Sequence, residues 1–338
     1  MDGLVSILVP CYNGERFVDR CVASILGQNY SRVEIIAVND GSTDRSEECI
    51  RSWEERFESA GMRLVCVSQE NKGPAGAVNA GLKRVNGEFL TLLDIDEELL
   101  PNAVSSRIEF LQAHADMDVV RSNGYYVRKG GKSLFLYDDA EKRTEDVFTA
   151  LVEGKTNNWA GSYTVRTSAL FAFYPDREIY PSRFGQNLQI LMPLTYRRRS
   201  GFLDEPQMNY HIQENSLSHT SAADPKEQME IFIKNQKEYC GIRIHLVRQI
   251  TETREEAENY IRLAETGYYR LVLKEAVRLK NEETAKKAYA GLRKATAVTI
   301  TDVIEYCRLF CPSTVFPLRC LRKLGSFLRI RAGGEMNG

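Results

Sequence analysis

The first hundred residues alternate between short β-rich segments and segments with helical periodicity. The β-rich segments cover residues 5–9, 33–38, 64–67 and 89–93. The helical segments lie between Gly14 and Gly27, over about 43–60 and over 74–85. This alternation is typical of βαβ units and a largely parallel sheet. We therefore predict an α/β fold in which helices flank a mostly parallel sheet and the polar loops that follow the strands meet at one edge, where such sheets bind ligands.

The rest of the chain divides into a looser α/β part and a helical part. The looser part is predicted to contain helices over 101–115, 145–153 and 185–197, β-rich segments over 118–137 and an extended segment over 202–212. After residue 222 the chain is rich in Lys, Glu and Arg with helical spacing. We predict one domain over 1–220, with halves 1–100 and 101–220, and a helical C-terminal region over 221–338.

A basic amphipathic segment ends the helical region. Residues 312–334 contain no Asp or Glu, and their Arg and Lys residues alternate with Leu, Phe and Ile. Such a helix binds an anionic membrane surface or an acidic partner, or it docks on the protein's own body with its arginines in solvent. The pattern leaves these readings open.

Charge and cysteine content limit the partners and the compartment. The 45 basic and 46 acidic side chains give a net charge of −1, which argues against a nucleic-acid partner. Eight cysteines in a chain of 338 residues, without a CxxC pair, indicate reduced thiols rather than a disulfide framework. With no basic leader and no apolar run of about 20 residues, the expected location is the cytoplasm or the cytoplasmic face of the membrane.

Polar residues that suit a nucleotide and a divalent cation follow three of the strands. No GxGxxG or GxxxxGK[ST] occurs, which argues against dinucleotide-binding and P-loop designs. Instead, Tyr12 offers a ring for stacking and Asp40 an acceptor for an N–H on a base edge. Asp94 and Asp96 are two carboxylates just beyond a buried strand, where a divalent cation relieves their repulsion and binds diphosphate oxygens. A solvated acidic loop that caps the next helix is the alternative.

Together these segments resemble family 2 glycosyltransferases of the GT-A fold. The resemblance is carried by the order and spacing of Val5–Gly14, Glu34–Asp44, Asn71–Pro74, Asn79–Leu82 and Gly87–Asp96. It implies a nucleotide-diphospho-sugar donor, often a UDP-sugar, and inverting transfer to an acceptor hydroxyl. It also makes 1–100 the donor-binding half and 101–220 the acceptor-binding half.

When the family motifs are matched to this sequence position by position, the resemblance assigns the donor-site residues. The residues expected to hold or line the nucleotide are Pro10, Tyr12, Asp40, Asn71, Asn79 and Asp94. The expected ligands of Mn²⁺ or Mg²⁺ are Asp94 and Asp96, which match a D-x-D motif. Two positions depart from the family pattern: Val78 stands where many relatives have Arg, and Glu97 stands at the fourth position of the run that is usually D-x-D-D.

The expected catalytic base is also altered. Relatives usually carry a Glu-Asp pair at the start of a helix in the second half, and the matching residues here are Gln186 and Asn187. Amides do not accept the acceptor's proton, so both are assigned to sugar binding. Asp176 and Glu178, a few residues upstream, are the first candidates for the base.

Three aromatic or imidazole side chains have two readings each. His211 and His219 bracket a polar loop, and the resemblance implies that one of them completes the metal shell; ordinary structural histidines are the alternative. Trp159 either stacks on an acceptor sugar or belongs to the core.

The leading hypothesis is a metal-dependent inverting glycosyltransferase of cell-surface polysaccharide synthesis. It would use a nucleotide-diphospho-sugar and a glycan, polyol-phosphate polymer or lipid-linked acceptor. A nucleotide-sugar-binding module with weakened catalysis and a nucleotidyltransferase on a similar fold are the alternatives. The helical region also offers a surface for a homodimer.

Overall fold

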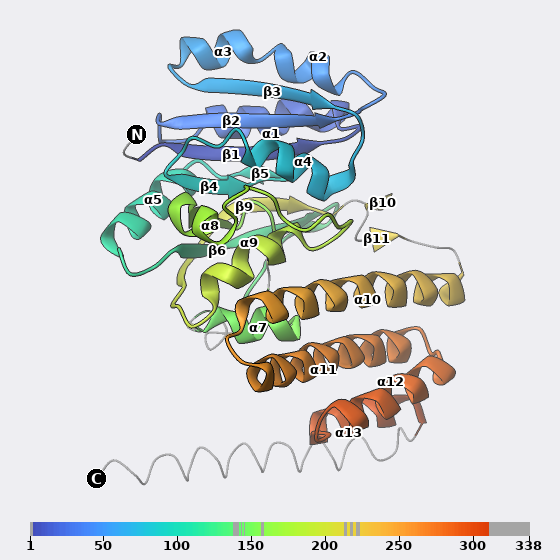
Figure 1. The fold of residues 1–338 in the computed structure, drawn as a ribbon. Coiled ribbons are helices and arrows are strands. Elements are labelled where there is room, and N and C mark those ends of the chain that lie inside the picture. The colour runs from blue at the N-terminus through green and yellow to red at the C-terminus, as the bar shows by residue number, and fades with distance from the viewer. Residues whose placement is uncertain are drawn as a thin grey trace. The chain divides into compact units, whose positions relative to one another are not determined.

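The computed structural model describes residues 3–137, 142, 144, 146–156, 159–212, 215–216, 219–220 and 224–310 (Figure 1). The chain divides into two compact units. The first comprises Met1–Leu151 and Lys155–Ser216, and the second comprises Val152–Gly154 and Leu217–Gly338.

A mixed sheet forms the centre of the first unit. Its strands within the described residues are β1 (Val5–Cys11), β2 (Val33–Asp40), β3 (Arg63–Gln69), β4 (Phe89–Leu92), β5 (Glu98–Leu99), β6 (Val119–Arg128), β7 (Gly131–Leu134), β8 (Tyr163–Arg166) and β9 (Gly201–His211). Their order is β3-β2-β1-β4-β8-β6-β9-β5, and β7 pairs with β6. The strands β1 to β4, β6 and β9 run in one direction, whereas β5, β7 and β8 run in the other. The prediction of a mostly parallel α/β sheet is confirmed.

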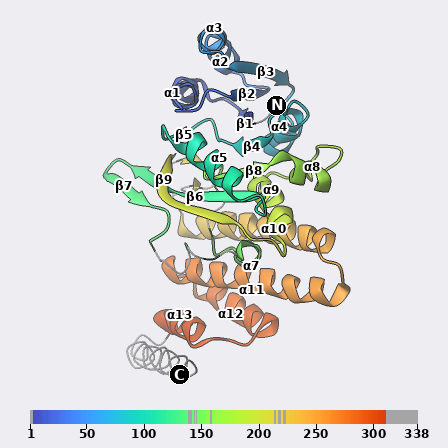
Figure 2. The same ribbon diagram turned by 90° about the vertical axis from the view of Figure 1, so that its left-hand side faces the viewer.

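Helices cover both faces of this sheet. They are α1 (Glu15–Leu26), α2 (Ser46–Arg51), α3 (Glu54–Ser59), α4 (Gly73–Leu82), α5 (Ala103–Ala113), α8 (Thr167–Phe173) and α9 (Gln186–Thr195). A further helix, α7 (Val147–Glu153), belongs to the first unit up to Leu151 and to the second from Val152. Figure 2 shows α1 and α4 on opposite sides of β1 and β2. On one face, Val18, Val22 and Ile25 of α1 are buried with alternate residues of β1. Each such side chain contributes roughly 1.5–3 kcal/mol on burial.

The opposite face depends on a close approach of α4 to β1. A Cβ atom added to Gly81 would lie 2.0 Å from Cδ1 of Leu8, which is itself fully buried. Glycine at this position therefore lets the helix lie close to the strand.

The structure differs from the sequence-based elements at two places. In place of the single helix expected over 43–60 there are two short helices, α2 and α3. Between them lies Trp53, whose side chain packs in the core and whose Nε1 donates to Asp19 Oδ1 (2.9 Å). This contact explains the interruption. The elements β5, β8 and α8 were not predicted. They span only two, four and seven residues, which is too short for periodicity to identify them.

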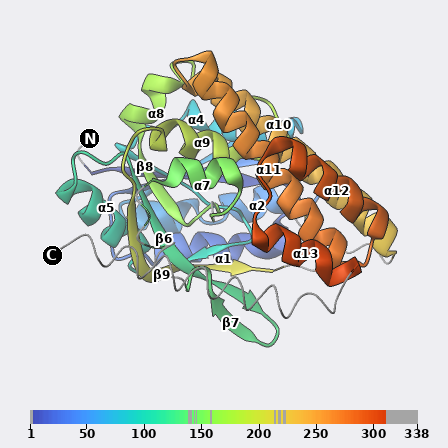
Figure 3. The ribbon, with the colours of Figure 1, turned by 90° about the horizontal axis from the view of Figure 1, so that it is seen from below.

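The second unit is the helical appendage predicted from the sequence. Its helices in the described residues are α10 (Pro225–Ile250), α11 (Arg254–Arg278), α12 (Glu282–Ala295) and α13 (Ile300–Phe310). The helix α11 packs against the other three (Figure 3). Arg270 of α11 pairs with both carboxylate oxygens of Asp302 in α13 (2.8 and 3.0 Å). None of the described helices has the length and apolar composition needed to cross a bilayer. The basic segment 312–334 lies outside the described residues.

A fully buried arginine ties several strands of the first unit together. Arg107 of α5 donates to Gln207 Oε1 (2.8 Å), Ser122 Oγ (2.9 Å) and the carbonyl of Gly161 (2.6 Å). Burial lowers its pKa to about 9, and within the described residues no carboxylate pairs with it.

We predict that Arg107→Ala lowers the free energy of unfolding by about 3 kcal/mol or more, because three buried acceptors lose their donor and a cavity remains. Urea denaturation of the full chain measures this loss. Arg84→Ala is the control, since Arg84 is exposed and its loss should change stability by no more than about 0.5 kcal/mol. Equal stabilities of the two variants would contradict the prediction.

Candidate functional site

The loops that follow β1, β2 and β3 form one continuous surface at the carboxyl edge of the sheet. The main-chain N–H of Asn13 donates to Ser42 Oγ (3.0 Å), and the N–H of Thr43 donates to Asn13 Oδ1 (2.8 Å). Gly41, with φ of 68°, lies so close to Asn71 that an added Cβ would be 2.7 Å from the Asn71 nitrogen. Only glycine suits this conformation and this contact.

Asp40 lies at the centre of that surface. It is buried at the end of β2, and its Oδ1 accepts from Gln69 Nε2 (2.7 Å) and from the main-chain N–H of Lys72 (2.8 Å). These bonds orient the carboxylate and leave Oδ2 as the oxygen for a ligand. Tyr12, on the neighbouring loop, is 53% exposed and offers its ring to solvent.

The other predicted nucleotide residues have different surroundings. Pro10 is half-buried in β1 beside Val38, and Asn71 is exposed next to Gly41. Both atoms of the Asn79 amide are engaged: Nδ2 donates to the carbonyl of Ile179 (3.0 Å), and Oδ1 accepts from its N–H (2.8 Å). Asn79 therefore braces the 174–182 segment against α4 rather than lining the surface beside Asp40.

Acidic residues follow β4 at the same edge. The N–H of Glu97 donates to the carbonyl of Asp94 (3.0 Å), which closes a turn over residues 94–97. Asp94 is exposed and Asp96 is half-buried, whereas Glu97 is only 2% exposed. We call residues 94–98 the acidic turn.

Desolvation is the main cause of the raised pKa of Asp94, Asp96 and Glu97 in the acidic turn. The surrounding protein and, to a smaller extent, the charge of Asp96 raise the pKa of Asp94 to about 7. Burial also raises the pKa of Asp96, against the opposing effect of Arg20, His211 and Arg16. Burial and the two aspartates raise the pKa of Glu97 to about 10, so Glu97 is neutral at pH 7.

Such an uncompensated pair of carboxylates suits a divalent cation. Mg²⁺ and Mn²⁺ prefer oxygen ligands, and they keep coordination positions open for water and phosphate oxygens. A solvent-accessible turn with two carboxylates offers such ligands. The described residues contain no group of three Asp, Glu, His or Cys side chains placed to bind one metal ion. A cation held by Asp94 and Asp96 would therefore take its remaining ligands from substrate and water.

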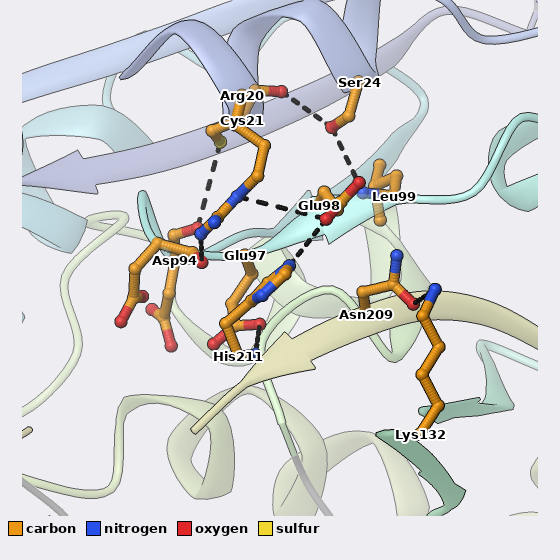
Figure 4. Close-up of polar contacts among 11 residues, drawn as sticks. Arg20, Cys21, Ser24, Asp94, Glu97, Glu98, Leu99, Lys132, Asn209 and His211 are labelled. Carbon is orange, nitrogen blue, oxygen red and sulfur yellow. Dashed lines mark hydrogen bonds and ion pairs between the residues drawn. The ribbon is translucent and has the colours of Figure 1, made fainter. Parts of the chain in front are cut away.

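The contacts of His211, expected as a possible third metal ligand, place it beside the acidic turn and do not test that assignment, which stays a prediction. Because β5 pairs with β9, His211 lies over the acidic turn, where its Nε2 bonds to Glu98 Oε2 (2.6 Å) and its main-chain N–H donates to Glu97 Oε2 (2.8 Å) (Figure 4). The ring is thus held by Glu98. His219 lies in β11 (His219–Thr220), and its side chain is outside the described part of the chain.

The amide pair at the start of α9 lies close to the acidic turn. Asn187 Oδ1 accepts from the hydroxyl of Tyr163 (2.7 Å), a fully buried residue of β8. Burial and the nearby charge of Asp94 raise the pKa of Tyr163, so its hydroxyl stays a donor. That bond leaves the NH₂ group of Asn187 as a donor for a ligand. Gln186 Nε2 donates to the carbonyl of Ser182 (3.0 Å).

The two residues predicted as catalytic bases lie at the opposite edge of the sheet. Arg177, between them, donates to the carbonyl of Val85 (2.9 Å), and Glu178 pairs with Lys83 at the end of α4. These partners precede β4, whereas Asp94 follows it, which separates them by roughly 15 Å along the strand. Asp176 and Glu178 are exposed there. We therefore do not carry the base assignment over to either residue, because the chain from α8 to α9 crosses the unit between positions 174 and 186.

Trp159 belongs to an aromatic cluster where β6 and β9 end. Its Nε1 donates to the hydroxyl of Tyr126 (3.1 Å), and its ring centroid lies 5.1 Å from that of Tyr210. The side chain is partly buried against the main core. The structure thus shows Trp159 packed on the core and half-buried, while its stacking on an acceptor sugar stays a prediction.

Three residues of the site were missed by the sequence analysis. Glu98 continues the acidic run, which was a usable signal. Arg20 and Tyr163 carry none, because each reaches the site from an element distant in sequence.

Comparison with known proteins gives a consistent result. Residues 6–173 match the model of the family described as glycosyl transferase family 2. The glycosyltransferase GlyG of Streptococcus pneumoniae is 33% identical over 171 residues, which are 50% of this chain and 54% of GlyG. The chain thus spans about half the length of this curated relative.

Two solved structures share the fold at low identity. S. aureus TarS 1–349 in complex with UDP has a TM-score of 0.54 and 15% identity, over 86% of this chain and 88% of that one. Mannosyltransferase PcManGT from Pyrobaculum calidifontis, in complex with GDP-Man and Mn²⁺, has a TM-score of 0.53 and 17% identity, over 98% and 87%.

We predict that Asp94→Asn raises the Tm of the metal-free protein at pH 8. The pKa of Asp94 is raised in the folded state from its ordinary 3.8 to about 7, so its contribution to stability is present below pH 4 and is lost as pH rises to about 7. The difference in Tm between the variant and the wild type should therefore grow from pH 4 to pH 7 and then level off. Thermal melts in EDTA across this range measure it, and a variant less stable than the wild type at pH 8 would contradict the pKa assignment.

Proposed function

Through its residues 6–173 the chain belongs to glycosyl transferase family 2, and we propose that it transfers one sugar from a UDP-sugar to a hydroxyl of a glycan, a polyol-phosphate polymer or a lipid-linked acceptor. The reaction is a single displacement. The oxygen of the acceptor hydroxyl attacks the anomeric carbon and its proton is released to solvent, the bond from that carbon to the diphosphate oxygen breaks with its electron pair on the departing diphosphate, and the anomeric configuration inverts.

The nucleoside end of the donor binds to the surface formed by the first three loops. Tyr12 stacks on the base, because its exposed ring stands beside the loop that carries Asp40. Asp40 Oδ2 accepts the N–H of the base, since Oδ1 is already engaged by Gln69 and Lys72. A uracil N–H suits such an acceptor. The solved complex of TarS with UDP-GlcNAc, a protein of the same fold, supports a UDP-sugar as donor.

The diphosphate binds at the acidic turn together with a divalent cation held by Asp94 and Asp96. When bound, Mn²⁺ or Mg²⁺ supplies positive charge that stabilises the departing diphosphate. The protein's own contribution is to hold two carboxylates close together despite their repulsion. Desolvation and the charge of Asp96 together raise the pKa of Asp94. The Mn²⁺ in the PcManGT complex supports this assignment.

The sugar-binding side of the site consists of Gln186, Asn187 and Trp159. Tyr163 orients the Asn187 amide so that its NH₂ group donates to a sugar or diphosphate oxygen. Trp159 offers an aromatic edge to the acceptor. Catalysis rests on positioning and charge, because amides do not take a proton and the first candidates for the base lie at the other edge.

The observation that carries this proposal is the convergence of Tyr12, Asp40, Asp94 and Asp96 at one edge, on loops that belong to adjacent parallel strands. The amide pair favours a second candidate, a module that binds the nucleotide-sugar without turnover. The two candidates differ in one measurable respect, the release of UDP in the presence of acceptor.

We expect Asp96→Ala to lower the rate of UDP release from a UDP-sugar by about 100-fold or more, since the loss of a metal ligand removes several kcal/mol of charge stabilisation. Asp176→Asn is the matched control, because it removes a carboxylate at the opposite edge and should leave the rate unchanged. A panel of UDP-sugars with Mn²⁺ and glycan acceptors supplies the assay. UDP binding by calorimetry without turnover would favour the binding module, whereas equal loss in both variants would contradict the site.

We also propose that the basic segment 312–334 brings the protein to an anionic membrane surface. Its five Arg and Lys residues and apolar residues provide the charge and the apolar contact that peripheral binding needs. Deletion of residues 312–338 should abolish co-sedimentation with vesicles that contain anionic lipid. The full chain with uncharged vesicles is the control, and an unchanged bound fraction after deletion would reject the proposal.

A further inference from the structure

One side of α1 holds the acidic turn through its main chain. Cys21 Sγ lies 3.9 Å from the carbonyl of Asp94, and Arg20 Nη2 donates to the carbonyl of Asp96 (Figure 4). Both contacts are made to backbone atoms, so the side chains of Asp94 and Asp96 remain available to a ligand.

The same helix continues this contact beyond the turn. Ser24 Oγ accepts from the N–H of Leu99 (3.1 Å), and Gln28 donates to the carbonyl of Leu100 (2.9 Å). Positions 20, 21 and 24 share one side of α1 because they follow its spacing of three to four residues, and Gln28 lies just beyond the end of the helix. The segment from Asp94 to Leu100 is therefore shaped along a rigid element.

Arg20 contacts the acidic turn at two residues, Asp96 and Glu98. Its Nη2 bonds to the Asp96 carbonyl, and its Nε lies 3.9 Å from Glu98 Oε2, the oxygen that also bonds to His211. Its guanidinium also lies 5.7 Å from the centroid of the Phe17 ring, which limits its rotation. Arg20 thus connects α1, the acidic turn and β9.

This arrangement fixes the main chain from which the carboxylate of Asp96 extends. The carbonyl of a residue and its Cβ leave the same Cα, so a bond that fixes the carbonyl also restricts the directions open to the side chain. The positive charge of Arg20 near Asp96 also opposes the repulsion between the two aspartates.

We propose that Arg20 is a positioning residue for the donor's diphosphate and cation, acting through the main chain of the acidic turn. The proposal rests on the proposed function, since it gives Arg20 its role at that same site. Arg20 neither binds the cation nor touches the donor. It keeps Asp94 and Asp96 in the arrangement that lets both bind one ion.

The test measures Mn²⁺ and UDP binding separately from turnover. Arg20→Met removes the bond and the charge, Arg20→Lys keeps the charge without the guanidinium fork, and Arg16→Met is the matched control. Arg16 lies on the same helix near Asp96 and packs on Phe17, but it makes no hydrogen bond to the turn within the described residues. Electron paramagnetic resonance titration gives the Mn²⁺ affinity in the presence of UDP, calorimetry gives the UDP affinity without metal, and thermal melts report folding.

We expect Arg20→Met to weaken Mn²⁺ binding by about 10- to 100-fold, the usual effect of removing a group that orients metal ligands. Arg20→Lys should lie between it and the wild type, Arg16→Met should stay within about 2-fold, and UDP affinity without metal should not change. Wild-type Mn²⁺ affinity in Arg20→Met, or an equal loss in Arg16→Met, would overturn the positioning role.

Two further outcomes are decisive. If Arg20→Met does not fold, Arg20→Lys decides, because wild-type affinity in that variant would overturn the proposal and an intermediate affinity would support it. A wild-type protein that binds neither UDP nor Mn²⁺ would overturn the proposed function itself. The wild-type titration therefore distinguishes failure of the site from failure of the role of Arg20.

Discussion

The repulsion between Asp94 and Asp96 is the constraint on which the site depends. Two carboxylates two residues apart, partly removed from water, are held together only because their backbone is fixed by other elements. The helix α1 binds the carbonyls of both residues, and β9 covers the turn through His211. The folded chain thus maintains an arrangement that is unfavourable without a cation, which is the usual condition of a binding site made in advance for its ligand.

The parallel direction of the strands explains why residues so distant in sequence meet. The strands β1, β2, β3 and β4 end at the same edge, so Tyr12, Asp40 and Asp94 lie on neighbouring loops. The antiparallel strand β8 then begins at that edge beside β4, and its Tyr163 connects to Asn187 at the start of α9. The strand pair of β4 and β8 therefore connects the acidic turn, which follows β4, to the amide of Asn187 through Tyr163.

The chemistry that this site supports is defined by which groups are charged. Glu97 is neutral at pH 7 and accepts a main-chain bond from His211, so it serves the structure of the turn rather than the charge of the site. Glu98 and Arg20 form a polar layer behind the two aspartates. At the start of α9, Gln186 donates to the carbonyl of Ser182, and Asn187 accepts from Tyr163. The groups assigned so far therefore suit binding and orientation of the donor, whereas none of them is assigned to accept the proton of the acceptor hydroxyl.

The sequence by itself determined the sheet, its flanking helices, the helical appendage and the loops that carry Tyr12, Asp40, Asp94 and Asp96, because strand and helix periodicity and the direction of parallel strands are local properties. Only the tertiary structure decided which side chains share a space. It placed Asp176 and Glu178 at the opposite edge from Asp94, gave the His211 ring to Glu98 and the Asn79 amide to Ile179, and brought Arg20 to the acidic turn. These outcomes depend on strand pairing and helix packing between residues about 75 to 115 positions apart, and spacing along the chain holds no record of such contacts.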